Sequence, residues 1–305
     1  YALQGGGAWD DVRAAACWAE ACGLAAFALP DHYLLSINPD VRVEAPDAFA
    51  QFAALARETD VIELVVLVAP ITFRHPAVLG KLAATIDGLS DGRFHLGVGT
   101  GWLEPEHEVF GIPFPDRSTR YEMLEEALGY LRAMFAAEPA GFEGEHYSLA
   151  AIPIDPRPVG AMRLVVGGTG AHKTPRLAGT YADEFNVYPG PDVADRIQRA
   201  KQAAIDAGRD PDKLLISSAG AVLVAATEAD YREVFAEKAS QLGLELDQLE
   251  AHFAHRNTPR GSAEQVRETL SQLAAAGVTR FYLQVGGEFD SAATRETLNF
   301  MGARA

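Results

Sequence analysis

The chain has 305 residues, of which 48% are hydrophobic and 22% charged, and its 26 lysines and arginines against 42 aspartates and glutamates give a formal net charge of −16. This balance is typical of a folded soluble protein, and the acidic excess excludes a general nucleic-acid binder or a protein held on an anionic membrane surface. The longest dense apolar stretch, Leu64 to Ala69, is far shorter than the roughly 20 residues of a membrane-spanning helix.

The cysteine content and the start of the chain bear on the cellular compartment. The two cysteines, Cys17 and Cys22, are five residues apart in a predicted helix, which places them about 140° apart around its axis. This spacing predicts neither a disulfide nor a shared metal. No basic leader with an apolar core follows Tyr1. Together these features predict a reduced, cytoplasmic protein.

Short β-rich runs alternate with helical patterns along the chain, which is typical of parallel strands joined by crossover helices. Several runs, such as LVVLVAP and FHLGVG, are continuously apolar, as strands covered on both faces are. The predicted strands are residues 1–4, 24–30, 63–70, 93–99, 163–168, 184–189, 214–224 and 279–285.

Helical patterns fill the gaps between these strands. The clearest are residues 9–23, 47–60 and 118–135, and a final helix with Ser262 as its N-cap and Gly277 as its stop. Eight strand–helix units in about 300 residues predict an α/β fold, a single (β/α)8 TIM barrel over residues 1–305. The alternative is an open doubly wound sheet, but GGGAW after the first strand lacks the GxGxxG spacing.

Two segments are longer than the connections that a minimal (β/α)8 barrel needs, and we predict them to be insertions after strands 4 and 7. Residues 137–162 are rich in glycine and proline, which predicts a short hairpin followed by an extended connection. Residues 227–260 combine helical patterns with a polar, basic loop. Neither insertion has the composition of a separate domain.

In a β/α barrel the functional residues lie at the carboxyl ends of the strands and in the loops that follow. Applied to the predicted strands, this rule selects residues 30–33, 69–76, 99–104, 167–170 and 186–188. Polar side chains, glycines and aromatic rings therefore converge on one rim. Such a rim predicts a small-molecule site.

Asp31 and His32, which follow the second strand, are the candidate catalytic residues. The histidine can donate or accept a proton near neutral pH, and a neighbouring carboxylate could fix its orientation. Adjacent residues at a strand end point in different directions, so the pattern does not require a direct Asp31–His32 pair. The alternative is a histidine that only closes the loop by hydrogen bonds.

The glycine cluster at the end of the fifth strand predicts an anion site. Gly167, Gly168 and Gly170 allow a ligand to approach the backbone closely, and free N–H groups that lead into a helix form a cradle for phosphate. Thr169 adds a hydroxyl. The alternative is a simple turn, and in barrels phosphate is more often bound after strands 7 and 8.

The remaining histidines have structural interpretations, and the sequence has no metal-site pattern. His75 is predicted to pack beside Pro76, His95 to lie in the barrel core, and Glu106 and His107 to begin a helix on the rim. The chain contains no HxH, HExxH or CxxC, so metal catalysis is not predicted. The absence of GxSxG argues in the same way against a serine nucleophile.

Four segments together resemble the luciferase-like flavin and deazaflavin oxidoreductases. They are PDH at residues 30–32, the block from VLVAPITFRHP to GIPF at 66–114, VVGGTG with RLAGTYADEFNV at 165–187, and the closing unit at 261–285. The likeness covers most of the chain in the right order, and its middle block is highly specific. It implies a barrel that binds FMN or coenzyme F420 with the ring at the strand carboxyl ends.

The resemblance also assigns cofactor-binding positions. The expected contacts are Val66, Leu67, Val68 and Ala69 together with Thr100, Gly101 and Trp102 around the ring, Gly167, Gly168 and Thr169 at the phosphate, and Asn186 at the cofactor tail or the pocket wall. Family members often have a non-prolyl cis peptide at the end of strand 3, here expected near Val66–Leu67.

The first choice of cofactor is F420. In F420-dependent sugar-phosphate dehydrogenases of this family, an Asp-His pair after strand 2 contacts the deazaflavin, and Asp31-His32 match that pair. Those enzymes carry a glutamate directly after the GTG of strand 4, where this chain has Trp102. The departure argues against sugar-phosphate oxidation and makes Trp102 a candidate for stacking on the ring or lining the pocket, with simple packing as the alternative.

Three functions follow from the resemblance. The first is F420-dependent hydride transfer to or from a small organic substrate, with His32 as proton donor or acceptor. The alternative is an FMN-dependent monooxygenase that uses reduced flavin and oxygen, and the second alternative is a non-catalytic flavin-binding barrel. FMN fits the acidic surface better than the polyanionic F420 tail, but the Asp31-His32 match favours F420.

The expected partners are a small-molecule substrate and a second copy of the chain, since family members are often homodimers. The substrate pocket is expected in the loops 34–46, 188–192 and 252–260. The candidate cations for an F420 tail are Lys173, Arg176, Arg256 and Arg260.

Overall fold

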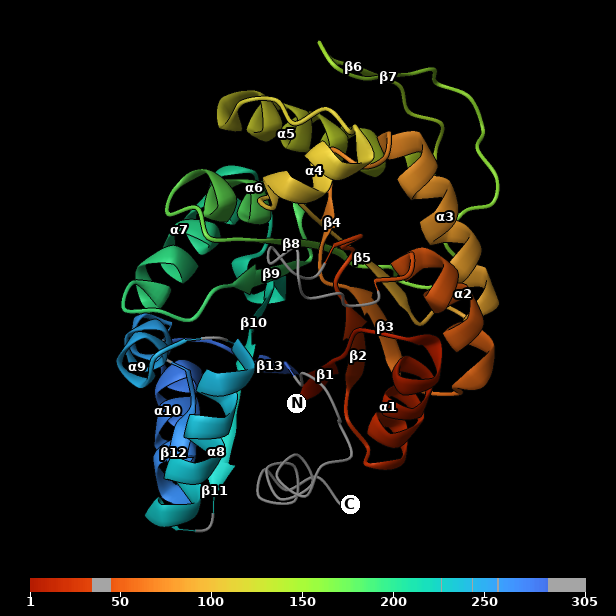
Figure 1. The fold of residues 1–305 in the computed structure, drawn as a ribbon. Coiled ribbons are helices and arrows are strands. Elements are labelled where there is room, and N and C mark those ends of the chain that lie inside the picture. Colours follow the sequence, from red (N-terminus) through yellow and green to blue (C-terminus); the bar gives the residue numbers. More distant parts are fainter. Residues whose placement is uncertain (35–44, 226, 243, 257, 285–305) are drawn as a thin grey trace.

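The computed structural model describes residues 1–34, 45–225, 227–242, 244–256 and 258–284. Eight parallel strands form a closed barrel with helices around it, as predicted (Figure 1). In barrel order the strands are β1 (Ala2–Gln4), β2 (Ala26–Leu29), β3 (Glu63–Val66), β5 (Phe94–Gly99), β8 (Leu164–Gly168), β9 (Glu184–Val187), β10 (Leu215–Ala221) and β13 (Arg280–Gln284). The β3–β5 and β13–β1 pairings close the ring.

Helices follow most of the strands and cover the outside of the barrel. They are α1 (Trp9–Ala21), α2 (Ala48–Glu58), α3 (Pro76–Leu89), α4 (Glu104–Phe110), α5 (Arg117–Met134), α6 (Lys173–Tyr181), α7 (Val193–Asp206), the short 3-10 helix η1 (Pro211–Lys213), α8 (Glu228–Leu242), α9 (Leu246–His255) and α10 (Ala263–Ala275). None of the helices in the described ranges is both long enough and apolar enough to cross a bilayer.

The structure confirms the predicted cap at the start of the last helix and shifts the start of the rim helix by two residues. Ser262 caps α10 by accepting a hydrogen bond from the backbone N–H of Gln265, whose side chain in turn accepts from the Ser262 N–H. The helix predicted near Glu106 begins two residues earlier, at Glu104, because Pro105 fits the first turn, where its missing N–H costs nothing.

Two predicted strands are interrupted. The run 63–70 divides into β3 and β4 (Ala69–Pro70) around a cis peptide between Leu67 and Val68. The run 214–224 leaves the barrel after Ala221, because the backbone of β11 (Leu223–Ala225) pairs with β12 (Arg260–Ser262) instead of with a barrel strand. The last residue of the run predicted at 279–285, Val285, lies outside the described residues.

Both insertions have the predicted character. After α5, β6 (Phe142–Glu143) and β7 (Ser148–Leu149) form an antiparallel hairpin that leads into an extended connection. After β10, helices α8 and α9 lie beside the small β11–β12 sheet and α10 (Figure 1). Neither insertion interrupts the ring of barrel strands.

Successive side chains of each strand face alternately outward under the helices and inward to the barrel axis. The outward set forms the large apolar core, in which Phe27, Phe94 and Phe185 are fully buried. The inward set is small in the middle of the barrel, with Ala26, Val65 and other residues packed around the axis. Small inward residues leave room for polar groups at the two barrel ends.

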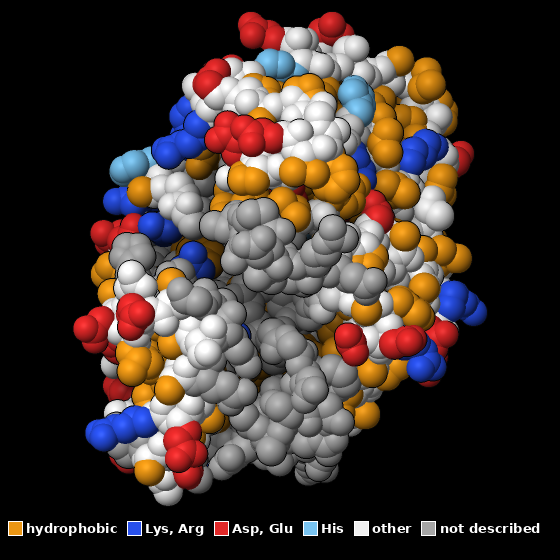
Figure 2. Space-filling model, in the orientation of Figure 1, with side chains coloured by type: hydrophobic (Ala, Val, Ile, Leu, Met, Phe, Trp, Pro, Cys, Tyr) orange, Lys and Arg blue, Asp and Glu red, His pale blue; other side chains and the backbone are white. Residues whose placement is uncertain are grey.

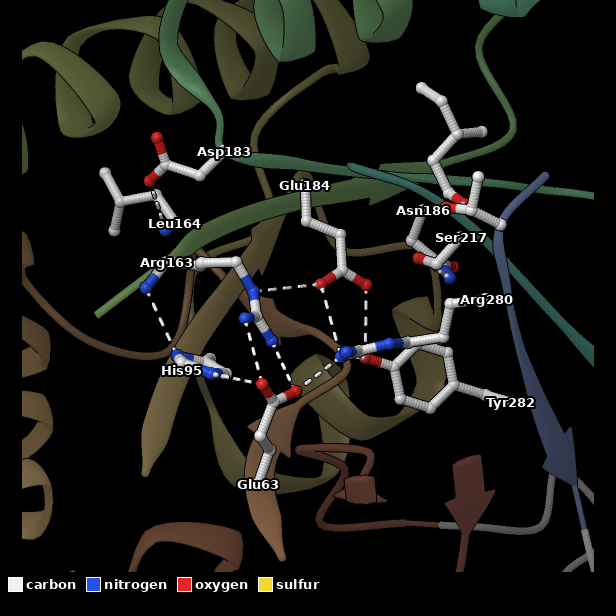
Figure 3. Close-up of polar contacts among 12 residues, drawn as sticks. Glu63, His95, Arg163, Leu164, Asp183, Glu184, Asn186, Ser217, Arg280 and Tyr282 are labelled. Carbon is white, nitrogen blue, oxygen red and sulfur yellow. Dashed lines mark hydrogen bonds and ion pairs between the residues drawn. The ribbon is translucent and has the colours of Figure 1, made fainter. Parts of the chain in front are cut away.

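The amino end of the barrel holds a network of charged side chains (Figure 3). Glu63 accepts two hydrogen bonds from Arg163, at 3.1 and 2.6 Å, and one from Arg280 at 2.6 Å. Glu184, which is completely buried, accepts a hydrogen bond from the Tyr282 hydroxyl at 3.1 Å and lies 3.4 Å from the Arg163 guanidinium. His95 lies in this layer, as predicted for a core histidine.

Candidate active site

The predicted rim residues do gather at the carboxyl end of the barrel. Asp31 and His32 follow β2, Thr100 to Trp102 follow β5, and the glycine cluster ends β8 and precedes α6. The predicted substrate loops are only partly described: residues 35–44 and 257 and the side chains of His252 and His255 lie outside the described part of the chain.

Asp31 does not pair with His32, a contact that the sequence pattern left open. It is completely buried and accepts hydrogen bonds from both Nη atoms of Arg74, at 2.5 and 3.3 Å. The same guanidinium donates to the Tyr33 hydroxyl at 2.5 Å and to Asp47. Burial raises the pKa of Asp31 to about 6, although Arg74 acts in the opposite direction. Asp31 is therefore an anchor for the segment that carries His32.

The carboxylate that contacts His32 comes from α4. Oε1 of Glu106 lies 2.9 Å from Nδ1 of His32, and the Glu106 side chain is only 1% exposed. The sequence analysis placed Glu106 at the start of a rim helix without assigning it a role. The sequence did contain a signal for this role, since a glutamate in the first two turns of a helix that follows a strand end can face the rim. The spacing alone could not choose among Glu104, Glu106 and Glu108.

Trp102 stands at the rim beside His32. The two rings meet edge to face, with centroids 5.8 Å apart and planes at 79°. Trp102 is 72% exposed, so simple core packing does not account for it. An exposed indole next to an ionisable ring is a surface on which a planar ligand can stack.

The end of β3 and the facing glycines form an apolar inner wall. A Cβ on Gly97 would lie 2.9 Å from the Val68 side chain, and one on Gly99 or Gly167 would lie 3.0 Å from it. The carbonyl of Leu67 accepts a hydrogen bond from Gln4 at 3.2 Å. The cis peptide lies between Leu67 and Val68, one residue after the expected position.

The glycine-rich segment after β8 is lined with hydroxyl groups. A Cβ on Gly170 would lie 2.2 Å from the Tyr121 hydroxyl oxygen and 2.6 Å from Oγ1 of Thr174, so only glycine fits there. These two hydroxyl groups are 3.0 Å apart. Within the described ranges, the backbone N–H groups of Gly170 and His172 donate to no protein carbonyl. Free N–H groups and hydroxyls before α6 match what a phosphate requires.

Sequence reasoning missed Tyr121 and Thr174 as members of this cradle. Tyr121 lies in the helix predicted at 118–135 and its ring is buried, but its hydroxyl lies beside Gly170 and Thr174. A tyrosine has an apolar ring and a polar hydroxyl, so it can pack in the core and line a polar site at once. Helical periodicity alone could not distinguish these two roles.

Asn186 lies inside the barrel but is already engaged. Its amide donates to the Ser217 hydroxyl at 3.0 Å, and the side chain is 7% exposed. Nearby, Gln284 donates to the side-chain oxygen of Gln4 at 3.0 Å. These amides give the inner wall fixed donors and acceptors without net charge.

The candidate cations for a polyanionic tail are mostly paired within the protein. Arg176 forms two hydrogen bonds with Glu125, at 2.8 and 2.6 Å, and Arg260 pairs with Glu250 at 2.5 Å. Arg256 donates to the Tyr188 hydroxyl. Lys173 lies over the Tyr121 ring, 5.2 Å from its centroid. Basic side chains on this face gather over α6 and α7 at its left edge (Figure 2).

The barrel and the groups at its carboxyl end place the protein in the class of β/α barrels whose candidate site lies at the strand ends, where the resemblance expects a flavin-like ring. The observed cradle and the apolar wall fit such a group, because the glycines let Val68 pack closely at the wall and bring the Tyr121 and Thr174 hydroxyls to the cradle. No three His, Cys, Asp or Glu side chains of the described residues come together as metal ligands would.

Comparison with known proteins specifies the family. The family model described as luciferase-like monooxygenase matches residues 2–302. A pyrimidine monooxygenase, RutA of Pseudomonas savastanoi pv. phaseolicola, is 39% identical over 124 residues, which are 40% of this chain and 34% of the relative. The match therefore spans about a third of that curated relative.

Two solved structures share the fold at low identity. An F420-dependent secondary alcohol dehydrogenase in complex with an F420-acetone adduct is 20% identical, with a TM-score of 0.77 and 99% of each chain covered. The oxygenating constituent of 3,6-diketocamphane monooxygenase from Pseudomonas putida, in complex with FMN, is 18% identical, with a TM-score of 0.73 and 97% and 91% covered. The chain belongs to the luciferase-like monooxygenase family.

Proposed function

We propose that the protein is a monooxygenase that binds reduced FMN at the carboxyl end of its barrel and oxidises a small organic substrate. The observation that carries the proposal is the cradle before α6, which offers the free N–H groups of Gly170 and His172 and two hydroxyls for one phosphate. The pairing of Arg176 and Arg260 with carboxylates leaves few free cations for a longer polyanionic tail. The name of the RutA relative supports oxygen chemistry.

The chain's own residues would bind and orient the reactants. The N–H groups before α6 would hold the phosphate, and the wall of Val68, Gly97 and Gly99 would support the ring. Trp102 would shield the reacting centre from water, and His32 would exchange a proton with the substrate. When bound, reduced FMN supplies two electrons to dioxygen, of which one oxygen atom enters the substrate and the other leaves as water.

The second candidate is F420-dependent hydride transfer, favoured by the match of Asp31-His32 to the pair in F420 enzymes. The structure weakens this support, because Asp31 is held by Arg74 and lies outside hydrogen-bond contact with His32. FMN and F420 would place their rings at the same position, against the apolar wall at the strand ends. The residues of this wall therefore do not distinguish the two cofactors.

An anaerobic titration of the purified protein with reduced FMN and with F420 tests the choice. We expect reduced FMN to bind with a dissociation constant in the micromolar range, about −8 kcal/mol, and the complex to consume oxygen when air is admitted. Binding of F420 alone, without oxygen uptake, would replace this proposal with the second candidate.

A further inference from the structure

Glu106 is unusual among the carboxylates of the rim because it is buried and yet forms no ion pair with an arginine or lysine of the described residues. Three nitrogen atoms converge on it instead. One oxygen faces Nδ1 of His32 at 2.9 Å, and the other accepts the backbone N–H groups of Tyr33 at 3.1 Å and Leu34 at 3.3 Å. Its carboxylate therefore has a fixed direction relative to the imidazole.

This geometry determines which nitrogen of His32 carries the proton. An ionised carboxylate only accepts hydrogen bonds, so the group opposite it must donate. Nδ1 of His32 is then the N–H position, and in the neutral ring the lone pair lies on Nε2. Nε2 makes no hydrogen bond to any described residue, and the side chain is 18% exposed, so this nitrogen is open to a ligand.

The position of Glu106 is itself fixed by the next residue. His107 contacts the carbonyl of Leu103 through Nδ1 at 2.9 Å and the Thr72 hydroxyl through Nε2 at 2.7 Å. A histidine bonded at both nitrogens locks the rotation of the short helix α4 against the loop after β4. Glu106, one residue earlier, is thereby aimed at His32.

We propose that Glu106 is a positioning residue that holds neutral His32 as its Nδ1–H tautomer, so that Nε2 accepts a proton from the substrate. The preferred substrate class is then a planar molecule that stacks on Trp102 and carries an acidic N–H or O–H beside the atom to be oxidised. The proton passes from that N–H or O–H to Nε2, and the electron pair stays on the substrate. The substrate class rests on the proposed function, whereas the tautomer does not.

The tautomer is measured directly by ¹⁵N NMR of histidine-labelled, cofactor-free protein, with His32→Ala to assign the signal. We expect the neutral wild-type ring to carry its proton on Nδ1, and Glu106→Gln to shift the population towards Nε2–H. Glu108→Gln is the matched control, because Glu108 lies on the same helix and is exposed. An unchanged tautomer in Glu106→Gln would overturn the proposal.

Turnover provides the second readout. For Glu106→Gln we expect kcat to fall about tenfold or more, the size of a general-base contribution partly lost, while KM changes little and Glu108→Gln matches the wild type. If Glu106→Gln does not fold, Glu106→Asp, which keeps the charge but shortens the reach, should give the same tautomer shift. If the wild-type protein shows no turnover with reduced FMN and none with F420, the proposed function is rejected. The NMR result would still decide the role of Glu106.

Discussion

The two ends of the barrel are built from opposite kinds of residue. At the amino end, Glu63 and Glu184 form ion pairs with Arg163 and Arg280 (Figure 3), although some buried atoms of this network form no hydrogen bond. At the carboxyl end, Trp102 is exposed, and the backbone N–H groups of Gly170 and His172 donate to no carbonyl of the described residues. We infer from this difference that the amino end stabilises the barrel and that the carboxyl end is the ligand-binding end.

The largest expected effect is at the amino end, from Glu63→Ala. It leaves Arg163 and Arg280 with only Glu184 as a nearby carboxylate, and because the network is partly buried, the cost should lie between about 1 kcal/mol, the value of an exposed pair, and about 3–5 kcal/mol, that of a fully buried one. Urea denaturation should show that loss in the free energy of unfolding. A cost below about 1 kcal/mol, the usual value of an exposed pair, would mean that this end is not the stabilising one.

The next effect is at the carboxyl end, from His32→Ala. We expect turnover to fall about 100-fold or more through loss of the general base, with cofactor affinity retained. The free energy of unfolding should change little, because the imidazole contacts only Glu106 and Trp102 among the described side chains. Equal turnover in mutant and wild type would remove His32 from the mechanism.

A smaller effect is expected from Tyr121→Phe, which removes one hydroxyl from the cradle while keeping the buried ring. Loss of one hydrogen bond to an anion should weaken FMN binding by about 1.5 kcal/mol, roughly tenfold. Isothermal titration measures it. Tyr130→Phe, in the same helix and also buried, serves as the control, and a similar loss in both variants would place the phosphate elsewhere.

The smallest effect concerns pH, where the two ends should respond oppositely. The arginines and His95 around Glu63 outweigh its burial and lower its pKa from the ordinary 4.5, so its contribution to stability is present above that pH and lost as the pH falls. Burial raises the pKa of Asp31 from 3.8 to about 6, so its contribution is present at low pH and lost as the pH rises through 6. Denaturation between pH 3 and 7 should therefore show a shallower acid limb in Glu63→Gln, and an acid limb as steep as that of the wild type would contradict this.

The sequence predicted the barrel well because its signals are local and repeated. Alternating apolar runs and helical faces identified eight strands, and the residues selected by the strand-end rule gather at the carboxyl end of the barrel. The luciferase-like resemblance identified the family, which the family model confirms.

The pairings within the rim could not be predicted in the same way. Arg74 reaches Asp31 across 43 residues, and Glu106 reaches His32 across 74. Such contacts depend on how the loops after β2, β4 and β5 fold over one another, which no local pattern specifies. The nearest carboxylate in sequence, Asp31, was therefore the natural choice for His32, and the structure selects a distant one.

In our proposal, the cofactor binds at the carboxyl end of the barrel alone. The most direct test compares FMN dissociation constants of Gly170→Ala, which places a methyl group against Tyr121 and Thr174, and Glu63→Gln at the amino end. Overpacking of about 1–3 kcal/mol predicts an affinity loss of about fivefold to 150-fold in Gly170→Ala and wild-type affinity in Glu63→Gln. Unchanged affinity in Gly170→Ala, or a selective loss in Glu63→Gln, would contradict the account.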